Sequence, residues 1–233
     1  MIIRCINFIF RALANRQRGL RMEERFWDRW LAQKGWKWPE EYRERLDPNT
    51  RLDERLALLI PADRSAPLRI LDVGAGPLTV LGKLHPRGPL AITAVDPLGE
   101  RYARLLSKHG VVPLVATGTL AAEELAGSLP HASFHLVHAR NSIDHALDPV
   151  AAIAAMLQVV EPGCCVYLDH EQNEAEREHW RGLHQWNFQV RDGRFLLSDA
   201  RHEVDLGHRF ASQAELEIDG SGDRAVAVFR RRQ

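Results

Sequence analysis

The chain has 233 residues, and its 31 Lys and Arg side chains balance 31 Asp and Glu side chains to a formal net charge of zero. That balance argues against a protein held on nucleic acid mainly by charge, and we expect no nucleic-acid partner. A hydrophobic share of 45% excludes wholesale disorder. The three cysteines form no C-x-x-C pair, so the sequence predicts a reducing, cytoplasmic compartment and no structural zinc or disulfide framework.

The first segment, residues 1–21, opens with an apolar run and continues with several arginines. The run is too short to span a bilayer, and no small-residue cleavage site follows it. Two interpretations stay open for this segment. It is a basic amphipathic helix that contacts a membrane surface peripherally, or a helix that packs on its own domain or on a second copy in a homodimer.

Aromatic residues cluster over residues 26–38, where four of the six tryptophans fall. Trp27, Trp30 and Leu31 have the spacing of one helix face. A second helix is expected to start at Pro39, because proline favours the first helical turn. The cluster is either part of the core or a roof over an acceptor pocket. We therefore predict an N-terminal helical extension over residues 1–51 and a main domain over residues 52–233.

The main domain alternates short apolar runs with helical stretches, and the runs are typical of buried strands. The predicted strands span residues 68–73, 90–95, 111–116, 134–139 and 164–168. Helices are expected over residues 100–109 and 149–160. Residues 188–197 and 215–229 have the pattern of two hairpins, each with a turn at its centre. Strands separated by helices predict an α/β fold with a doubly wound, mostly parallel, Rossmann-like sheet.

The most informative stretch runs from Ile70 to Thr79, with the sequence ILDVGAGPLT. A strand ends at Asp72, the chain turns through Gly74-x-Gly76, and a helix is expected to begin at Pro77. The next strand ends at Asp96, which lies 20 residues after Gly76 (96 − 76 = 20). An acidic residue at that strand end is placed to accept the hydroxyls of a nucleotide ribose.

The loop departs from the dinucleotide pattern G-x-G-x-x-G. Thr79 stands at the third glycine position, and Pro77 removes one of the amide donors that would hold a pyrophosphate. Both departures disfavour NAD. Asp72 can take a cationic amino group, so a ligand with an adenine, a ribose and an amino acid, but no phosphates, fits better.

This stretch resembles motif I of the class I S-adenosylmethionine-dependent methyltransferases, and Asp96 is similar to that family's ribose-binding acidic residue. Weaker similarities follow at residues 118–125, 134–149 and 159–163. The family's sheet ends in an antiparallel hairpin, which the resemblance assigns to residues 215–229. It also implies a cofactor-binding role for nine residues: Asp72, Gly74, Ala75, Gly76, Asp96, Leu98, Ala122, Glu123 and Asn141.

Within that resemblance, Asp72 and the glycine loop hold the methionine part, Asp96 binds the ribose, and Leu98 packs on the adenine. Ala122 and Glu123 line the adenine edge. Asn141 follows the fourth strand, at the junction of cofactor and acceptor.

Two histidines are candidates for removing a proton from a hydroxyl acceptor, since imidazole titrates near neutral pH. His170 follows the fifth predicted strand, and His145 follows the fourth. We expect no metal, because His170, Glu171 and Glu174 are too closely spaced to ligate one ion well. Residues 180–188 mix aromatic and polar side chains, as a sugar-binding surface does.

These features together predict an enzyme that transfers a methyl group from S-adenosylmethionine to a small-molecule or glycan acceptor, at a hydroxyl. Asn141 is not followed by Pro-Pro-aromatic, so methylation of DNA bases is not supported. Two alternatives remain open: a cofactor-binding module without turnover, and an NAD-linked oxidoreductase.

Overall fold

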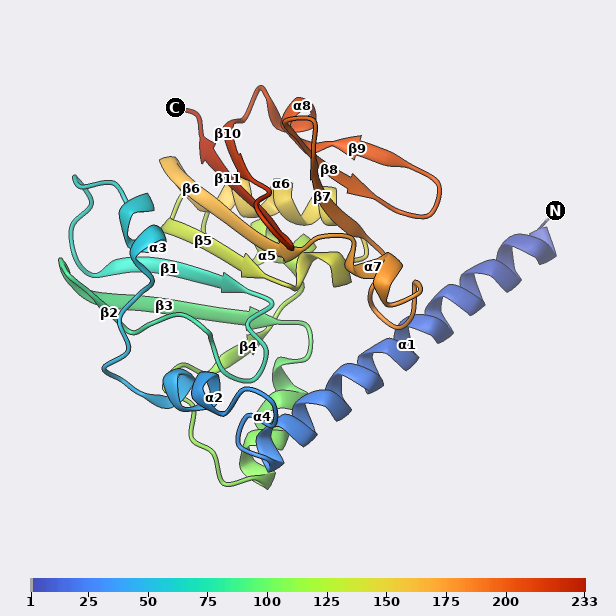
Figure 1. Cartoon of the computed structure of the whole chain (residues 1–233), viewed down its shortest axis with the longest axis horizontal. Coiled ribbons are helices and arrows are strands. Elements are labelled where there is room, and N and C mark those ends of the chain that lie inside the picture. The colour runs from blue at the N-terminus through green and yellow to red at the C-terminus, as the bar shows by residue number, and fades with distance from the viewer. Residues whose placement is uncertain (1) are drawn as a thin grey trace.

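The computed structural model describes the backbone of residues 2–233 and the side chains of residues 16–233. A twisted central sheet forms the middle of the molecule (Figure 1), with strand order β10-β11-β6-β5-β1-β3-β2 and β4 paired to β3. Its strands are β1 (Leu68–Val73), β2 (Leu84–His85), β3 (Gly88–Asp96), β4 (Thr117–Thr119), β5 (Phe134–Arg140), β6 (Val160–Glu171), β10 (Ala214–Asp219) and β11 (Arg224–Arg231).

Strands β4, β3, β1, β5 and β6 pair in parallel, whereas β11 runs antiparallel to both β6 and β10. This arrangement confirms the predicted mostly parallel sheet with an antiparallel C-terminal hairpin. The parallel strands all point the same way, so their carboxyl ends lie along one edge of the sheet. Open α/β sheets bind ligands at that edge.

Helices cover the sheet, and a small second sheet packs beside it (Figure 1). The α-helices are α1 (Ile2–Ala32), α2 (Pro39–Leu46), α3 (Glu54–Leu59), α4 (Gly99–Lys108), α5 (Leu125–Ser128), α6 (Pro149–Val159), α7 (Glu174–Arg177) and α8 (Leu206–Phe210). Two short 3-10 turns are η1 (Ala122–Glu124) and η2 (Ile143–His145), and the second sheet contains β7 (Asn187–Arg191), β8 (Arg194–Ser198) and β9 (Glu203–Asp205).

One face of the central sheet packs against α6 and the inner face of the second sheet in a single apolar core. The Asp148 side chain caps α6 by accepting from the Ala151 amide at 3.0 Å, as its place before Pro149 predicts. The opposite face is covered by α3, whose Leu56 packs with Ile70 and Leu136 of the strands. Both predicted hairpins form, as β7–β8 and β10–β11.

Two predicted elements differ from the structure. The helix expected from Pro77 is absent, and residues 74–83 form an irregular loop that leads into β2. The loop passes so close to the chain before α3 that a Cβ on Gly82 would lie 2.0 Å from the Arg51 carbonyl oxygen. The strand expected over residues 111–116 is also wrong, since pairing with β3 begins only at Thr117.

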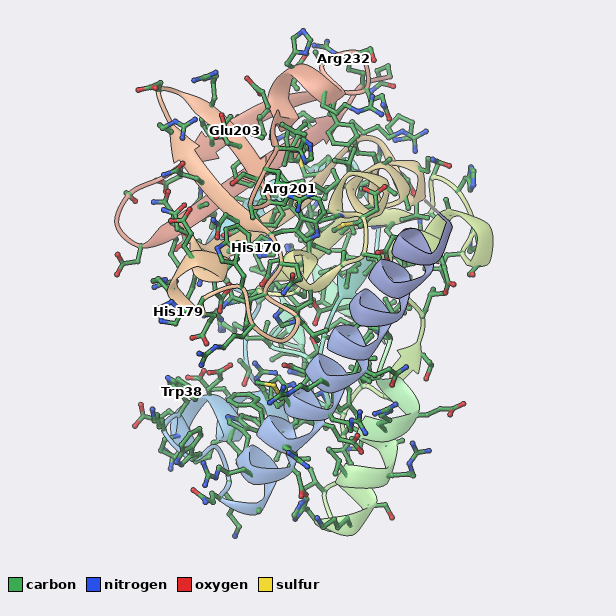
Figure 2. All side chains as sticks on the ribbon, turned by 90° about the vertical axis from the view of Figure 1, so that its right-hand side faces the viewer. Trp38, His170, His179, Arg201, Glu203 and Arg232 are labelled. Atoms are coloured by element: carbon green, nitrogen blue, oxygen red, sulfur yellow. The ribbon has the colours of Figure 1, made fainter. Side chains whose placement is uncertain are left out.

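Helix α1 covers the side of the molecule that a crossover helix after β1 would otherwise cover. Its C-terminal half packs along α4, where Trp30 and Leu31 are buried beside Tyr102. Two ion pairs also join α1 to α4: Glu24 lies 2.9 Å from Arg101, and Asp28 lies 2.8 Å from Lys108. Figure 2 shows α1 running across the face of the molecule.

Residues 16–32 of α1 therefore pack on their own domain. The side chains of residues 1–15, on which the expected membrane or homodimer contact of residues 1–21 largely depends, lie outside the described residues. Among the helices that the structure describes, none is long and apolar enough to cross a membrane.

We expect Trp30→Ala to lower the free energy of unfolding by about 3–5 kcal/mol, because it removes a large side chain that is only 2% exposed. Urea denaturation followed by circular dichroism measures this. Trp38→Ala, at a position 47% exposed, is the matched control and should cost about 1 kcal/mol or less. Equal losses in the two variants would mean that α1 is not anchored through Trp30.

Candidate functional site

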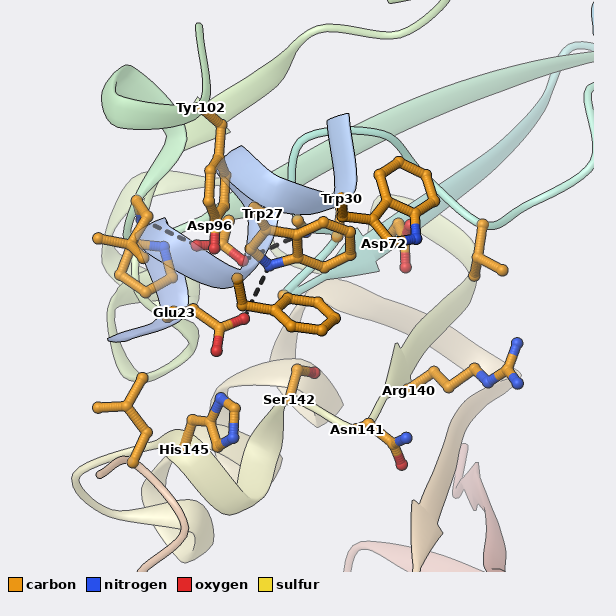
Figure 3. Close-up of a pocket in the computed structure, with 18 of the residues that line it drawn as sticks. Glu23, Trp27, Trp30, Asp72, Asp96, Tyr102, Arg140, Asn141, Ser142 and His145 are labelled. Atoms are coloured by element: carbon orange, nitrogen blue, oxygen red, sulfur yellow. Dashed lines mark hydrogen bonds between the residues drawn. The ribbon is translucent and has the colours of Figure 1, made fainter. Parts of the chain in front are cut away.

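A cavity of about 580 Å³ opens at the carboxyl edge of the parallel strands, within the range of about 300–1,000 Å³ that is usual for ligand sites. Four polar residues at or near the strand ends line it: Asp72 of β1, Asp96 of β3, Arg140 of β5 and Glu171 of β6. Figure 3 shows α1 side chains covering one end of this cavity and the β5–α6 loop lining the other.

The carboxylate of Asp72 is buried and fully bonded. Its Oδ1 accepts from Nδ1 of His138 at 2.7 Å, and its Oδ2 accepts from the Thr79 hydroxyl at 2.5 Å. The Leu81 amide then donates to that hydroxyl at 3.1 Å. Asp72 thus fixes the loop after β1 and the neighbouring strand β5, and its side chain is only 2% exposed.

Asp96 lies beside the loop, with both oxygens bonded to backbone amides. The Leu98 amide donates to Oδ1 at 2.8 Å, and the Gly76 amide donates to Oδ2 at 3.3 Å. Burial raises the pKa of Asp96 to about 6, against the opposing effect of these two amides. Each oxygen keeps a second lone pair, so the ionised carboxylate can still accept from two hydroxyl groups.

Glycine is required at two positions of the loop by both conformation and space. Gly74 has φ +69°, and a Cβ there would lie 2.2 Å from Cβ of Ser142. Gly76 has φ +65°, and a Cβ there would lie 2.9 Å from the ring of Trp27. The Gly74 and Ala75 amides donate to the Val95 carbonyl at 2.8 and 3.1 Å, which ties the loop to β3.

Helix α1 forms the roof over this loop. The Trp27 ring lies on Gly76, and its Nε1 donates to Oε1 of Glu23 at 2.7 Å. The guanidinium of Arg45, from α2, stacks on the Trp27 ring at 5.5 Å from its centre and donates to the Leu78 carbonyl. Trp30 of the tryptophan cluster is therefore core, as one interpretation expected, and Trp27 lines the cavity beside the glycine loop. That the cluster covers an acceptor stays a prediction.

The turn after β5 closes the cavity floor. Asn141 adopts φ +46°, and its Oδ1 accepts from the Glu171 amide at 3.0 Å. The hydroxyl of Ser142 donates to the Val73 carbonyl at 3.0 Å. These bonds join the ends of β1, β5 and β6, and they place Asn141 between the loop after β1 and the far end of the cavity (Figure 3).

After Asn141 in the chain comes Asp144, which is 2% exposed. Three histidines surround its carboxylate. Its Oδ2 lies 3.1 Å from Nδ1 of His184 and 3.3 Å from Nε2 of His145, and its Oδ1 lies 3.5 Å from Nδ1 of His170. Burial raises the pKa of Asp144, but the three histidines outweigh burial and hold that pKa far below its usual range. Glu174 stands next to the cluster, and burial together with the charge of Asp144 raises the pKa of Glu174 to about 7.

The structure brings seven of the nine expected cofactor residues to the cavity: Asp72, Gly74, Ala75, Gly76, Asp96, Leu98 and Asn141. Ala122 and Glu123 are not among the residues that line it. Ala122 packs against the main core, and Oε1 of Glu123 accepts from the Leu147 and Asp148 amides at 2.7 and 3.1 Å.

The two candidate catalytic histidines lie in different environments. His145 lines the cavity, whereas His170 is 1% exposed and stacks on Phe188 with ring centres 4.2 Å apart. Side chains alternate along a strand, so Glu171 points to the cavity and His170 into the core beside it. Of residues 180–188, only Leu183 and His184 line the cavity. Whether the segment contacts a sugar or is a partly exposed edge of the core stays open.

Sequence reasoning missed two parts of the site. Glu23 of the roof had no local pattern that separates it from ordinary surface residues. Asp144 lay in the weak similarity over residues 134–149, but no role was assigned to it. His184 was a weak signal, because it lies in the polar and aromatic segment that was interpreted as an acceptor surface. These residues meet only through tertiary packing.

The fold and the site together define an α/β protein with a Rossmann-like cofactor cavity, and comparisons with known proteins agree. A family model described as a methyltransferase domain matches residues 41–212. The chain therefore belongs to this family of methyltransferase domains. This agrees with the resemblance in motif I, which implies S-adenosylmethionine as the methyl donor. No curated protein matches the sequence significantly.

Solved structures share the fold at low sequence identity. One is a chain of the complex between the Haloferax volcanii Trm112 methyltransferase activator and a methyltransferase, which is 11% identical with a TM-score of 0.53, over 86% of this chain and 96% of that one. A T. thermophilus 16S rRNA methyltransferase is 14% identical with a TM-score of 0.43, and 81% of this chain covers only 42% of it. A Burkholderia thailandensis didemethyltoxoflavin methyltransferase is 15% identical, with a TM-score of 0.45 over 77% and 78% of the two chains.

We expect Gly74→Ala to destabilise the fold more than Gly193→Ala does. Both glycines have φ +69°, but a Cβ at Gly193 meets nothing within 4 Å, so that variant costs only the left-handed conformation, about 1–2 kcal/mol. The contact with Ser142 should add about 1–3 kcal/mol at Gly74. Urea denaturation of the two variants measures the difference, and equal costs would show that the loop can move away from Ser142.

Proposed function

We propose that the protein methylates a hydroxyl group of a polar small molecule or glycan. One observation carries this proposal: the glycine loop with Asp96 and the cluster around Asp144 line the same cavity. The residues proposed to bind the cofactor and the basic residues proposed to take a proton thus line the same cavity. Methyl transfer to a hydroxyl requires both sets of residues to reach the reacting atoms.

The chain's own residues fit the cofactor. Gly74 and Gly76 leave backbone unshielded by any Cβ beside the cavity, and Asp96 keeps free lone pairs for two hydroxyls of a ribose. Leu98 offers an apolar contact for an adenine. Asp72 acts indirectly, because its carboxylate is only 2% exposed and already bonds the side chains of Thr79 and His138. When bound, S-adenosylmethionine supplies a methyl group on a sulfonium that becomes a neutral thioether as the acceptor oxygen takes the methyl and loses its proton.

The acceptor end of the cavity is strongly polar. Arg140, Glu171, Glu174 and Arg224 line it together with the amide of Asn141. Asp169 pairs with both arginines, at 2.6 Å from Arg224 and 3.7 Å from Arg140. Such a surface favours an acceptor with several hydrogen-bonding groups, because an apolar ligand would leave these side chains desolvated and unpaired.

A hydroxyl acceptor must lose its proton as the bond to the methyl carbon forms. The cluster of Asp144, His145 and His184 supplies basic groups at the cavity wall, and the Asp144 carboxylate stabilises positive charge beside it. His170 contacts the cluster from behind. We therefore assign His145 to the acceptor side of the reaction and His170 to positioning Asp144.

Replacing Asp96 should weaken the cofactor complex. Asp96→Ala removes the carboxylate proposed to hold the ribose, and we expect the Kd for S-adenosylmethionine to rise by about tenfold or more, equivalent to about 1.4 kcal/mol per factor of ten. Isothermal titration calorimetry measures this, with Asp63→Ala as an exposed acidic control. An unchanged Kd would refute the assigned role, and binding of NAD instead would overturn the cofactor itself.

Cofactor affinity should also fall at acidic pH. Burial raises the pKa of Asp96 to about 6, so the carboxyl is protonated below that pH and loses acceptor capacity. We expect the affinity to decrease by up to about tenfold per pH unit below 6 and to level off above it. Asp96→Asn cannot titrate and should show a flatter profile in calorimetry between pH 5 and pH 8. Parallel profiles would assign the effect to another group.

We expect His145→Ala to abolish most turnover while the Kd for S-adenosylmethionine stays within about twofold, since the imidazole faces the acceptor end of the cavity. His202→Ala is the control, because the His202 side chain is 75% exposed and pairs only with Asp199 among the described residues. Release of S-adenosylhomocysteine in the presence of a panel of hydroxylated acceptors provides the assay. Full activity of His145→Ala would exclude this role.

A further inference from the structure

Three side chains at the acceptor end of the cavity bring one ligand atom each toward a common point. These atoms are Oδ2 of Asp144, Nε2 of His145 and Nδ1 of His184. The two nitrogens are 3.2 Å apart, and Oδ2 lies 3.1 Å from His184 and 3.3 Å from His145. The three atoms therefore form a nearly equilateral triangle.

Hydrogen bonding cannot account for all three edges of this triangle. Each ring nitrogen carries at most one proton, and an ionised carboxylate only accepts. If both imidazoles donate to Asp144, both nitrogens carry a proton and cannot hydrogen-bond to each other. If Nε2 of His145 donates to Nδ1 of His184, that nitrogen carries no proton and cannot donate to Asp144. At least one edge is always unpaired, whereas a cation at the centre would accept a lone pair from all three atoms.

The edge lengths also match metal coordination. Two ligands held at about 2.1 Å from one ion with tetrahedral angles lie about 3.4 Å apart, and octahedral angles bring them to about 3.0 Å. The observed edges of 3.1–3.3 Å fall between these values. Two histidines and one carboxylate on one face of an ion leave its remaining positions open.

A second observation comes from the buried side of the cluster. Oδ1 of Asp144 and both ring nitrogens of His170 are buried, and they have no hydrogen-bond partner within the described part of the chain. The His170 side chain is 1% exposed, and its Nδ1 lies 3.5 Å from Oδ1. Carboxylates that bind metals are usually supported through their outer oxygen by a neighbouring group, and His170 stands at that position.

The geometry points to a binding site for one divalent transition-metal ion, Zn²⁺ or Fe²⁺, held by Asp144, His145 and His184. Imidazole ligands favour these ions over Mg²⁺ and Ca²⁺, which prefer oxygen ligands. His145 and His184 line the cavity, so the open positions of the ion face the acceptor space.

This inference deepens the proposed function in one respect that depends on that function. With an ion bound, Nε2 of His145 would hold the ion instead of accepting a proton. An acceptor that offers an oxygen to that ion would lose its hydroxyl proton more easily, since a bound cation acidifies hydroxyl groups. The substrate class is then a molecule whose methylated hydroxyl, or a donor oxygen beside it, can ligate a metal. The metal site itself does not depend on methyl transfer.

The test is metal binding by the full chain after removal of metals with a chelator. We expect calorimetry to show one Zn²⁺ bound per chain and no comparable binding of Mg²⁺. Co²⁺ should give visible absorption bands of a low-coordinate site, which Zn²⁺ displaces. In His184→Ala and His145→Ala the Kd for Zn²⁺ should rise by about 100-fold or more, while His202→Ala should bind as the unchanged chain does. Circular dichroism and S-adenosylmethionine binding verify that each variant is folded.

Absence of stoichiometric Zn²⁺ binding, or unchanged binding in folded His184→Ala and His184→Gln variants, would overturn the metal site. The proposed function fails separately. A chain that binds no Zn²⁺ but binds S-adenosylmethionine and methylates a hydroxyl keeps the proposed function and loses the metal site. A chain that binds Zn²⁺ stoichiometrically but methylates no hydroxyl keeps the metal site and loses the proposed function.

Discussion

Asp72 joins three segments of the chain at the floor of the cavity. A carboxylate that is 2% exposed must be fully hydrogen-bonded to be stable in the folded state, and its partners here are His138 of β5 and Thr79 of the following loop. The loop cannot leave β1, and β5 cannot shift along β1, without breaking one of these bonds. The positions of Gly74, Gly76 and the turn after β5 all depend on this constraint.

The same constraint explains how the domain works without a helix after β1. The irregular loop exposes backbone groups that a helix would satisfy internally, and side chains of the loop itself and of α2 bond them instead. Thr79 accepts from the Leu81 amide, and Arg45 donates to the Leu78 carbonyl. Helix α1 then supplies the apolar cover through Trp27 and Trp30. The described part of the N-terminal helix is thus a structural part of the cavity.

The sequence predicted the sheet and several residues that line one edge of the cavity because their signals are local. Gly74, Gly76 and Asp96 follow directly from strands whose apolar runs are unbroken, and parallel pairing brings their ends together. The cluster of Asp144 and His184 was not predictable in this way. The two residues lie on separate loops, and their meeting depends on the lengths of those loops and on the packing of β7. His170 shows a related difficulty, because side chains alternate along β6. His170 points into the core, whereas its neighbour Glu171 points to the cavity.

The long separation between α1 and its binding surface has a consequence for biosynthesis. Trp30 leaves the ribosome well before Tyr102 and Leu106, the α4 residues in whose cluster it becomes buried. Until α4 is made, the aromatic face of α1 has only near partners such as Tyr42 of α2, and the part that α4 later covers stays exposed. Such exposed apolar surface is what chaperones recognise and what drives premature aggregation. Closure of the roof is a late step in folding, because contacts between distant segments form slowly. A nascent chain that stalls before α4 would carry this unprotected tryptophan surface.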